Sequence, residues 1–426
     1  MARRFLQGFR AIGEAAALCR PQVVSAYPIT PQTGIIEELA LMVADGSLQA
    51  EYVNVESEHS AASVVLGASA TGVRVYSATT SQGLLLMTEV LYNIAGLRLP
   101  VVMTCVNRAV SAPINIWNDQ QDSVTLRDAG ILQLYAETNQ EGVDLLIQAY
   151  RIAEDHRVLL PVMVCMDGYI LPHAYEPVDI PTQEQVDSYL PAFKPVYRLD
   201  PADPVTMGAL AEPDKYLEAR YMLHKGMDAS LGVIQEAAAK FKAEFGRNSG
   251  GLVEAYRMDD ADVALVTMGS LAATLKEAVD ELRTEGKKVG VVRIISFRPF
   301  PTQAVRQAMA KASRVVVIEK AISLGSEGPL ALDMKAAFYG VTRPPTIESC
   351  VAGLGGRDIP VETIKRLLDQ RSPASPHFVD LRTDLELEGV ETRRRITSLP
   401  RVTRRAPAAA SRLARALYSA PRGATS

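Results

Sequence analysis

The chain has 426 residues, of which 48% are hydrophobic and 22% are charged, so it can bury more than one hydrophobic core. Its formal net charge of −4 gives no general attraction for nucleic acid or for an anionic membrane. No apolar run approaches the roughly 20 residues of a membrane span, and the first ten residues do not read as a signal peptide.

Four cysteines occur singly along the chain, without a CxxC pair: Cys19, Cys105, Cys165 and Cys350. Three of them lie in or beside apolar strand-like runs, where a free cysteine usually acts as a small buried hydrophobe. The spacing predicts no zinc or iron–sulfur site in this chain. Single, scattered cysteines without a disulfide pattern fit a reducing, cytoplasmic compartment.

Strand-like apolar runs alternate with helical patterns over residues 1–170, which predicts a doubly wound parallel sheet with helices on both faces. The expected strands are residues 23–26, 73–78, 100–106, 132–136 and 158–166. The expected helices are residues 32–44, 60–70, 83–94 and 141–154.

A proline-rich connecting arm and a long helix are expected over residues 171–259. The helix is predicted at 214–245, with an irregular apolar stripe of Leu217, Tyr221, His224, Ala229 and Leu231. A second α/β domain follows over 260–370. Its expected strands are 263–267, 289–295, 314–319 and 345–347, and its expected helices are 271–285, 302–312 and one after Asp358.

The composition changes over residues 371–426, where many arginines stand among alanine and proline. The simplest interpretation is a solvated tail without a packed core. A segment that docks on an acidic partner is the alternative, and a nucleic-acid-binding tail is disfavoured by the acidic remainder of the chain.

Four polar segments stand where predicted strands end. The first contains Thr30 before Pro31, and the second contains Glu58 at the start of a helix rich in small residues. A carboxyl group in such surroundings could be desolvated, with a raised pKa. Each segment also has a purely structural interpretation, because Thr30 and Pro31 suit a helix start and a glutamate suits the first turn of a helix.

The third segment contains Thr80, Ser81 and Gln82, and the fourth begins with Asn107 and Arg108. The third could bind a ligand or simply cap a helix. An arginine at a strand end can clamp a carboxylate with two hydrogen bonds, although a surface role is also open. Because the carboxyl ends of parallel strands share one edge of a sheet, the four segments together predict a shared pocket.

The amino-acid sequence of these segments resembles that of the alpha subunit of pyruvate:ferredoxin oxidoreductase and its 2-oxoacid relatives. The similar runs are AYPITPQT, VESEHSAA, TTSQG, NRAVSAPINIWNDQQD and MDGYILPH, followed later by ISFRPFP, VVVIEKAISLGSEGPL and VAGLGGRDI. The resemblance covers about residues 1–370 in the same order. It implies a pyrimidine-binding domain for thiamine diphosphate over 1–170 and a transketolase C-terminal-like domain over 260–370.

The resemblance also implies roles for individual residues. Glu58 corresponds to the cofactor-activating glutamate, whose carboxyl group stabilises the imino tautomer of the aminopyrimidine ring. Thr30 corresponds to the threonine near the substrate, and Arg108 to the arginine that receives the substrate carboxylate. Thr80, Ser81 and Gln82 are expected to contact the cofactor.

The implied reaction is the coenzyme A-dependent oxidative decarboxylation of a 2-oxoacid, with electrons passed to ferredoxin or a related acceptor. The family's diphosphate and magnesium motif, GDG followed by an asparagine, and its cluster cysteines are absent from this sequence. Mg2+ and [4Fe-4S] clusters are therefore expected on partner beta, gamma and delta subunits, so this chain would be inactive alone.

Pyruvate is the favoured substrate, and branched-chain or aromatic 2-oxoacids such as phenylglyoxylate remain open. A transketolase or a pyruvate-dehydrogenase-type beta subunit would share the domain pair but lack the YPITP, NRA and WND runs. A non-catalytic scaffold subunit is the alternative from another class.

Overall fold

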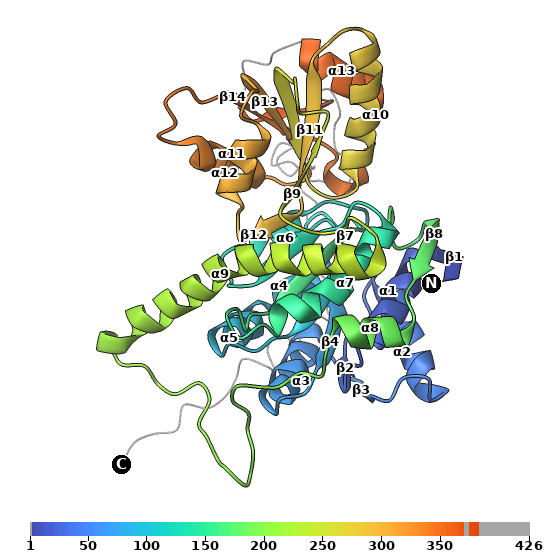
Figure 1. Ribbon diagram of the computed structural model, residues 1–426, viewed down its shortest axis with the longest axis vertical. Coiled ribbons are helices and arrows are strands. Elements are labelled where there is room, and N and C mark those ends of the chain that lie inside the picture. The colour runs from blue at the N-terminus through green and yellow to red at the C-terminus, as the bar shows by residue number, and fades with distance from the viewer. Residues whose placement is uncertain (1, 370–374, 383–426) are drawn as a thin grey trace, which may run out of the picture. The chain divides into compact units, whose positions relative to one another are not determined.

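The computed structural model describes residues 2–369 and 375–382. The described chain forms a seven-stranded sheet, a six-stranded sheet and a small two-stranded sheet (Figure 1). The arginine-rich segment beyond residue 390, predicted to be a tail, lies outside the described residues. No helix in the described part is long and apolar enough to cross a membrane.

The seven-stranded sheet has the order β12-β6-β7-β5-β4-β2-β3. All of its pairings are parallel except that of β12 with β6. Its strands are β2 (Val23–Ser25), β3 (Glu51–Val53), β4 (Val75–Thr79), β5 (Val102–Asn107), β6 (Leu132–Tyr135), β7 (Val162–Asp167) and β12 (Ser296–Arg298). Every residue of β4, β5, β6 and β7 is buried, as expected for strands covered on both faces.

Helices cover both faces of this sheet, so the predicted doubly wound architecture is confirmed (Figure 1). One apolar core contains residues of α1 (Gly8–Leu18), α2 (Thr33–Ala44) and α7 (Asn139–Ala153). The other contains residues of α3 (Glu58–Ala70), α4 (Ser81–Leu86), α5 (Thr88–Gly96) and α6 (Gln121–Thr125).

The single helix predicted over residues 83–94 is wrong, because two short helices, α4 and α5, occupy this stretch. The Thr88 hydroxyl donates to the carbonyl oxygens of Leu84 and Leu85 at 3.5 and 2.6 Å. A threonine that binds the preceding turn in this way competes with the regular helical hydrogen bonds. The break between the helices lies at Met87.

The chain also contains elements that the sequence patterns did not predict. Strand β1 (Ala2–Gln7) pairs with β8 (Tyr175–Ile180) as the two-stranded sheet. Helix α8 (Gln183–Tyr189) follows within the proline-rich arm, where Thr182 and Gln185 form a capping box. The pairing of β1 with β8 joins segments about 170 residues apart, so no local pattern reveals it.

Helix α9 (Pro213–Phe245) has the predicted extent, but its predicted apolar stripe is wrong. Leu217 is 74% exposed and Tyr221 is 57% exposed. The buried face starts at Leu223 and continues through Gly226, Ser230, Val233, Ile234, Ala237, Phe241 and Phe245. The helix packs on α5, α7 and α8, and Figure 1 shows its first turns extending beyond these helices.

The six-stranded sheet has the order β15-β14-β13-β10-β11-β9, with β9 as its one antiparallel strand. Its strands are β9 (Val253–Tyr256), β10 (Val263–Thr267), β11 (Val289–Ile294), β13 (Arg314–Glu319), β14 (Thr346–Val351) and β15 (His377–Phe378). The sequence missed β9. It also assigned β15 to the tail, because a two-residue strand leaves no readable pattern.

Helices α10 (Leu271–Thr284) and α13 (Val361–Asp369) cover one face of this sheet, and α11 (Thr302–Ala308) and α12 (Pro329–Phe338) cover the other (Figure 1). Helix α12 was not predicted. Its first turn is held by Glu319, whose carboxylate accepts hydrogen bonds from the backbone N–H groups of Leu330 and Ala331 at 2.8 and 3.0 Å. Burial raises the pKa of Glu319 to about 8.

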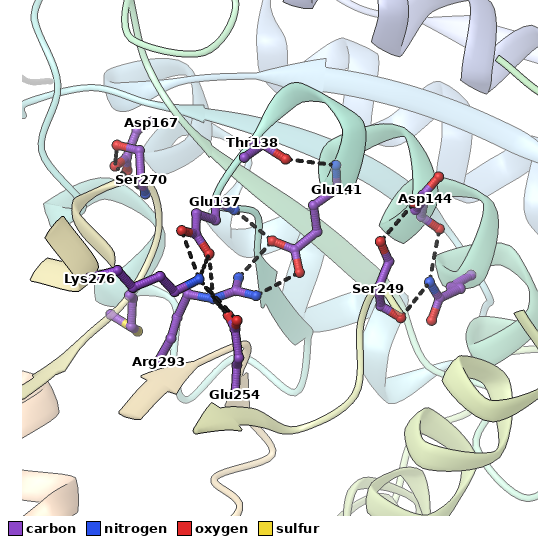
Figure 2. A network of polar contacts seen from close by, with 12 residues as sticks. Glu137, Thr138, Glu141, Asp144, Asp167, Ser249, Glu254, Ser270, Lys276 and Arg293 are labelled. Carbon is purple, nitrogen blue, oxygen red and sulfur yellow. Dashed lines mark hydrogen bonds and ion pairs between the residues drawn. The ribbon is translucent and has the colours of Figure 1, made fainter. Parts of the chain in front are cut away.

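A buried ionic cluster joins the two large sheets (Figure 2). Arg293 of β11 donates to both oxygens of Glu141 at 2.6 and 2.9 Å and to Glu254 at 2.8 Å. Lys276 Nζ, in α10, lies 2.7 Å from Glu137 Oε2 and 3.0 Å from Glu254 Oε1. Burial alone would lower the pKa of Arg293, but the surrounding carboxylates raise it, so the guanidinium stays charged.

Candidate functional site

The polar segments after β2, β4 and β5 meet at the guanidinium group of Arg108. Its Nη1 donates to the carbonyl oxygen of Thr30 at 2.8 Å, and its Nη2 donates to Gln82 Oε1 at 3.3 Å. The carboxyl ends of these strands are adjacent in the sheet. Three of the four segments that were predicted to converge, those of Thr30, Gln82 and Arg108, therefore do so.

Arg108 keeps donors available for a ligand. Its Nε donates to the carbonyl oxygen of Asn115 at 3.3 Å, so three of its five N–H groups are used by described residues. Burial lowers the pKa of Arg108, but an arginine remains charged after such a shift. Two N–H donors on a fixed, charged guanidinium are what a carboxylate accepts as a bidentate pair.

Asp122 binds the backbone around Arg108, a role that was not predicted from the sequence. Its Oδ2 accepts from the backbone N–H groups of Ser81 and Arg108 at 2.9 and 3.0 Å. Its Oδ1 accepts from Asn107 Nδ2 and from the backbone of Ser123, both at 2.7 Å. Burial raises its pKa. The only sequence signal was its place in the polar run NDQQD.

Thr80 and Ser81 are fully buried, and their hydroxyl groups bind the protein itself. The Thr80 hydroxyl donates to the carbonyl oxygen of Val106 at 2.5 Å, and the Ser81 hydroxyl donates to that of Ala109 at 2.5 Å. Thr80 stands at the N-cap position of α4, but its side chain does not cap the helix. The capping interpretation of this turn is wrong, because these hydroxyls tie β4 to β5.

Thr30 does not cap α2, so that structural interpretation is also wrong. The helix begins at Thr33, and Gln32 occupies the N-cap position. Thr30 is exposed, and only its carbonyl oxygen is held by Arg108. Gln32 is buried, and its Nε2 donates to the carbonyl oxygen of Ala78 at 2.9 Å, which fixes the end of β2 against β4.

Glu58 is a buried carboxyl group, 7% exposed, at the first position of α3. Ser57 caps this helix through its side chain, so Glu58 is not needed as the cap. Among the described residues, the Glu58 carboxyl has no hydrogen-bond partner. Glu56, two residues earlier, is exposed and instead accepts a hydrogen bond from Ser60.

The Glu58 carboxyl faces the backbone of Gly83 at the start of α4. A Cβ atom added to Gly83 would lie 2.6 Å from Glu58 Oε1 and 2.7 Å from Thr79 Oγ1. The Thr79 hydroxyl is buried and has no hydrogen-bond partner in the described part of the chain. Two unpartnered polar groups beside a bare glycine suit a ligand with donors and acceptors of its own.

Within residues 2–369 and 375–382, no group of three or more His, Cys, Asp or Glu side chains could hold a metal ion. All four cysteines are buried and free of disulfide bonds, including the one that the sequence did not place beside an apolar run.

Comparisons with known proteins identify the family of this chain. Residues 14–239 match the family described as "Pyruvate flavodoxin/ferredoxin oxidoreductase, thiamine diP-bdg". Residues 261–364 match "Pyruvate:ferredoxin oxidoreductase core domain II". The chain belongs to the alpha subunits of the 2-oxoacid:ferredoxin oxidoreductase family. This membership decides against the transketolase and pyruvate-dehydrogenase-type alternatives.

The similar relatives are subunits of such enzymes. The pyruvate synthase subunit PorA of Methanosarcina barkeri is 49% identical over 390 residues, which cover 89% of this chain and 97% of that protein. PorA of Methanothermobacter thermautotrophicus is also 49% identical, covering 86% and 95%. The ketoisovalerate oxidoreductase subunit VorA of Pyrococcus horikoshii is 44% identical, covering 86% and 93%.

A solved structure shares the fold. It is the 2-oxoglutarate:ferredoxin oxidoreductase of Magnetococcus marinus, with a TM-score of 0.66 at 20% sequence identity. The match covers 86% of this alpha subunit and 65% of that chain, so the alpha subunit spans just under two thirds of its neighbour's length.

Proposed function

We propose that this alpha subunit works in a pyruvate:ferredoxin oxidoreductase, which converts pyruvate and coenzyme A to acetyl-CoA and CO2 and passes electrons to ferredoxin or a related acceptor. The observation that carries the proposal is the buried Glu58 carboxyl beside Gly83, which has no hydrogen-bond partner among the described residues. Gly83 lies in the helix after β4, the strand that neighbours the one before Arg108. The relatives named pyruvate synthase support the choice of substrate.

Glu58, with the Thr79 hydroxyl and the Gly83 backbone, would hold the aminopyrimidine ring of thiamine diphosphate. When bound, thiamine diphosphate would supply a nucleophilic carbon for the 2-oxo group and a cationic ring as the electron sink for loss of CO2. Glu58 would hold its proton against a ring nitrogen and so favour the imino tautomer. Thr80 and Ser81 would act by fixing the turn, because their hydroxyls already bind the protein.

Arg108 would bind the substrate carboxylate, since two of its N–H groups are free of described partners. Thr30 is exposed, and its carbonyl oxygen contacts this guanidinium, so its hydroxyl would orient the bound 2-oxoacid. Gln82 would complete the clamp by holding Nη2.

The partner subunits would complete the enzyme. We assign the diphosphate site and Mg2+ to a beta subunit and the [4Fe-4S] clusters to gamma and delta subunits, because this sequence lacks both motifs. Residues 1–170 would then form the pyrimidine-binding domain and 260–370 the transketolase C-terminal-like domain, joined by the arm of 171–259. Four buried, unpaired cysteines suit the reducing cytoplasm.

A branched-chain 2-oxoacid is the second candidate substrate. It is supported by the ketoisovalerate oxidoreductase subunit, which is 44% identical, compared with 49% for two of the pyruvate synthase subunits. Parallel assays of the complex with pyruvate, 2-ketoisovalerate and phenylglyoxylate would rank the three acyl groups.

The test of the function is Glu58→Gln in the complex co-purified with its partner subunits. Loss of the proton at this position should reduce pyruvate-dependent reduction of ferredoxin by about 100-fold or more, with subunit composition unchanged. Glu56→Gln is the matched control, because Glu56 is exposed two residues away. Full activity of the Glu58 variant would instead indicate a scaffold subunit, and turnover by the chain without partners would contradict the assignment.

A further inference from the structure

The loop between Arg108 and helix α6 is held by the six-stranded-sheet half of the chain. Two segments of that half contact it: residues 320–322, which follow β13, and the short 3-10 helix η1 (Leu354–Gly356), which follows β14. Lys320 Nζ donates to Asn118 Oδ1 at 2.7 Å, and the Lys320 carbonyl oxygen accepts from the backbone N–H of Gln120 at 2.8 Å. The backbone of Ile322 donates to Gln121 Oε1 at 2.9 Å.

Helix η1 contacts the loop closer to the arginine. The Gly355 backbone N–H donates to Asp119 Oδ2 at 3.2 Å, and its carbonyl oxygen accepts from Asn115 Nδ2 at 3.0 Å. These contacts join residues more than 230 positions apart in the sequence. The loop that follows β5 therefore contacts the segments after β13 and β14 of the six-stranded sheet.

Asn115 contacts both helix η1 and Arg108. Its backbone carbonyl accepts from Arg108 Nε at 3.3 Å. Its side chain donates to Gly355 and accepts from the backbone N–H of Trp117 at 2.8 Å. One amide side chain therefore fixes the position of the peptide group that binds the guanidinium.

The fit between η1 and the loop leaves no space for side chains. Gly355 has φ +61° and Gly356 has φ +84°, a conformation that other residues rarely adopt. A Cβ atom on Gly355 would lie 2.5 Å from Asn115 Nδ2, and one on Gly356 would lie 2.5 Å from Trp117 Cβ. The two glycines let the backbone of η1 approach Asn115 closely enough to bind it.

We propose that Asn115 is a positioning residue for the 2-oxoacid, which holds the Arg108 guanidinium through its carbonyl oxygen and is itself held by Gly355. The inference rests on the proposed role of Arg108 as the carboxylate clamp. It gives the six-stranded half of the chain a part in substrate binding, although none of its side chains touches Arg108 among the described contacts. A guanidinium whose accepting peptide group is no longer fixed samples more orientations and binds a carboxylate less well.

The test compares Asn115→Ala with Gln121→Ala in the complex co-purified with its partner subunits. Each variant removes a side-chain hydrogen bond between the segment of residues 115–121 and the six-stranded half, but only Asn115 contacts Arg108. We expect Asn115→Ala to raise KM for pyruvate about tenfold. Neither kcat nor KM for coenzyme A should change much. Gln121→Ala should leave KM for pyruvate within about twofold.

A second variant, Gly355→Ala, keeps Asn115 but pushes its amide group away, and should raise KM for pyruvate in the same way. Thermal unfolding of each complex checks that the variants remain folded. If Asn115→Ala and Gly355→Ala leave KM for pyruvate unchanged, or if Gln121→Ala raises it equally, the contact only packs the interface and the inference is wrong. A wild-type complex without 2-oxoacid turnover, or an active Glu58→Gln complex, would instead overturn the proposed function.

Discussion

Four N–H groups converge on the two oxygens of Asp122, and they come from three different segments of the chain. Ser81 belongs to the turn after β4, Asn107 and Arg108 end β5, and Ser123 lies in α6. A carboxylate is the side chain that accepts all four, because it carries no donor of its own when ionised. Asp122 thereby fixes the backbone from which Arg108 extends.

Asp122→Asn should therefore destabilise the chain by about 1–3 kcal/mol, because the amide NH2 group would face N–H donors and leave them unpaired. Urea unfolding of the full chain measures this loss. Asp128→Asn is the control, since Asp128 is exposed and should change stability by less than about 0.5 kcal/mol. Equal stability of the two variants would show that the Asp122 cluster tolerates an unpaired donor.

At the level of single residues, the sequence predicted where functional groups gather but not how they are bonded. The rule that ligands collect at strand ends brought Thr30, Gln82 and Arg108 together. It could not show that the Glu58 carboxyl and the Thr79 hydroxyl have no hydrogen-bond partner among the described residues, because partners are brought together only by folding. Nor could it show that Asn115 is held by a residue 240 positions away.

Helix α9 illustrates what periodicity can predict at the level of an element. Its extent was predicted almost to the residue, because Pro213 starts it and Gly246, with φ +72°, ends it. The choice of buried face was wrong. A 33-residue helix has apolar residues on several faces, and only its neighbours α5, α7 and α8 decide which face is covered and from which turn onward.

Two alanine substitutions distinguish the covered and uncovered parts of this helix. Phe241 is fully buried and stacks on Phe245 at 4.3 Å between ring centroids, so Phe241→Ala should cost about 3–5 kcal/mol. Leu217 is 74% exposed, so Leu217→Ala should cost less than about 0.5 kcal/mol. The measurement is the free energy of unfolding of the full chain in urea. Comparable losses would mean that the first turns of α9 are packed.

At the level of the whole molecule, a cluster of ion pairs links the two halves of the described chain that contain the large sheets. The cluster in Figure 2 contains three carboxylates, Glu137, Glu141 and Glu254, and two cations, Lys276 and Arg293. Strand β12 adds a direct link, because it leaves the six-stranded half and pairs with β6 of the other sheet. Neither link follows a local pattern in the sequence.

Removing Arg293 should test how strongly the cluster holds the sheets together. Arg293→Met leaves three carboxylates with Lys276 as their one cation. Because Arg293 and Glu141 are buried, the free energy of unfolding in urea should fall by about 3–5 kcal/mol. Adding Glu141→Gln to the same chain should recover part of the loss, because it removes the carboxylate that Arg293 pairs with on both oxygens. Strictly additive losses would show that the two residues do not stabilise each other.

The amino-acid pattern predicted the fold class, most of the strands and helices of both large sheets, and the edge of the sheet where the polar segments meet. These features depend on local periodicity and on polar residues that follow apolar runs, which any reader of the chain can see. The resemblance to the 2-oxoacid:ferredoxin oxidoreductases pointed to Glu58, Thr30 and Arg108.

The three-dimensional structure was needed to show which polar groups bind other groups of the described residues and which do not. It showed that Thr80 and Ser81 bind the backbone, that Glu58 does not, and that Arg108 is held through Asn115 by the distant η1 helix. The physical reason is that a hydrogen bond depends on distance in space. Contacts between residues hundreds of positions apart leave no mark on the periodicity of either segment.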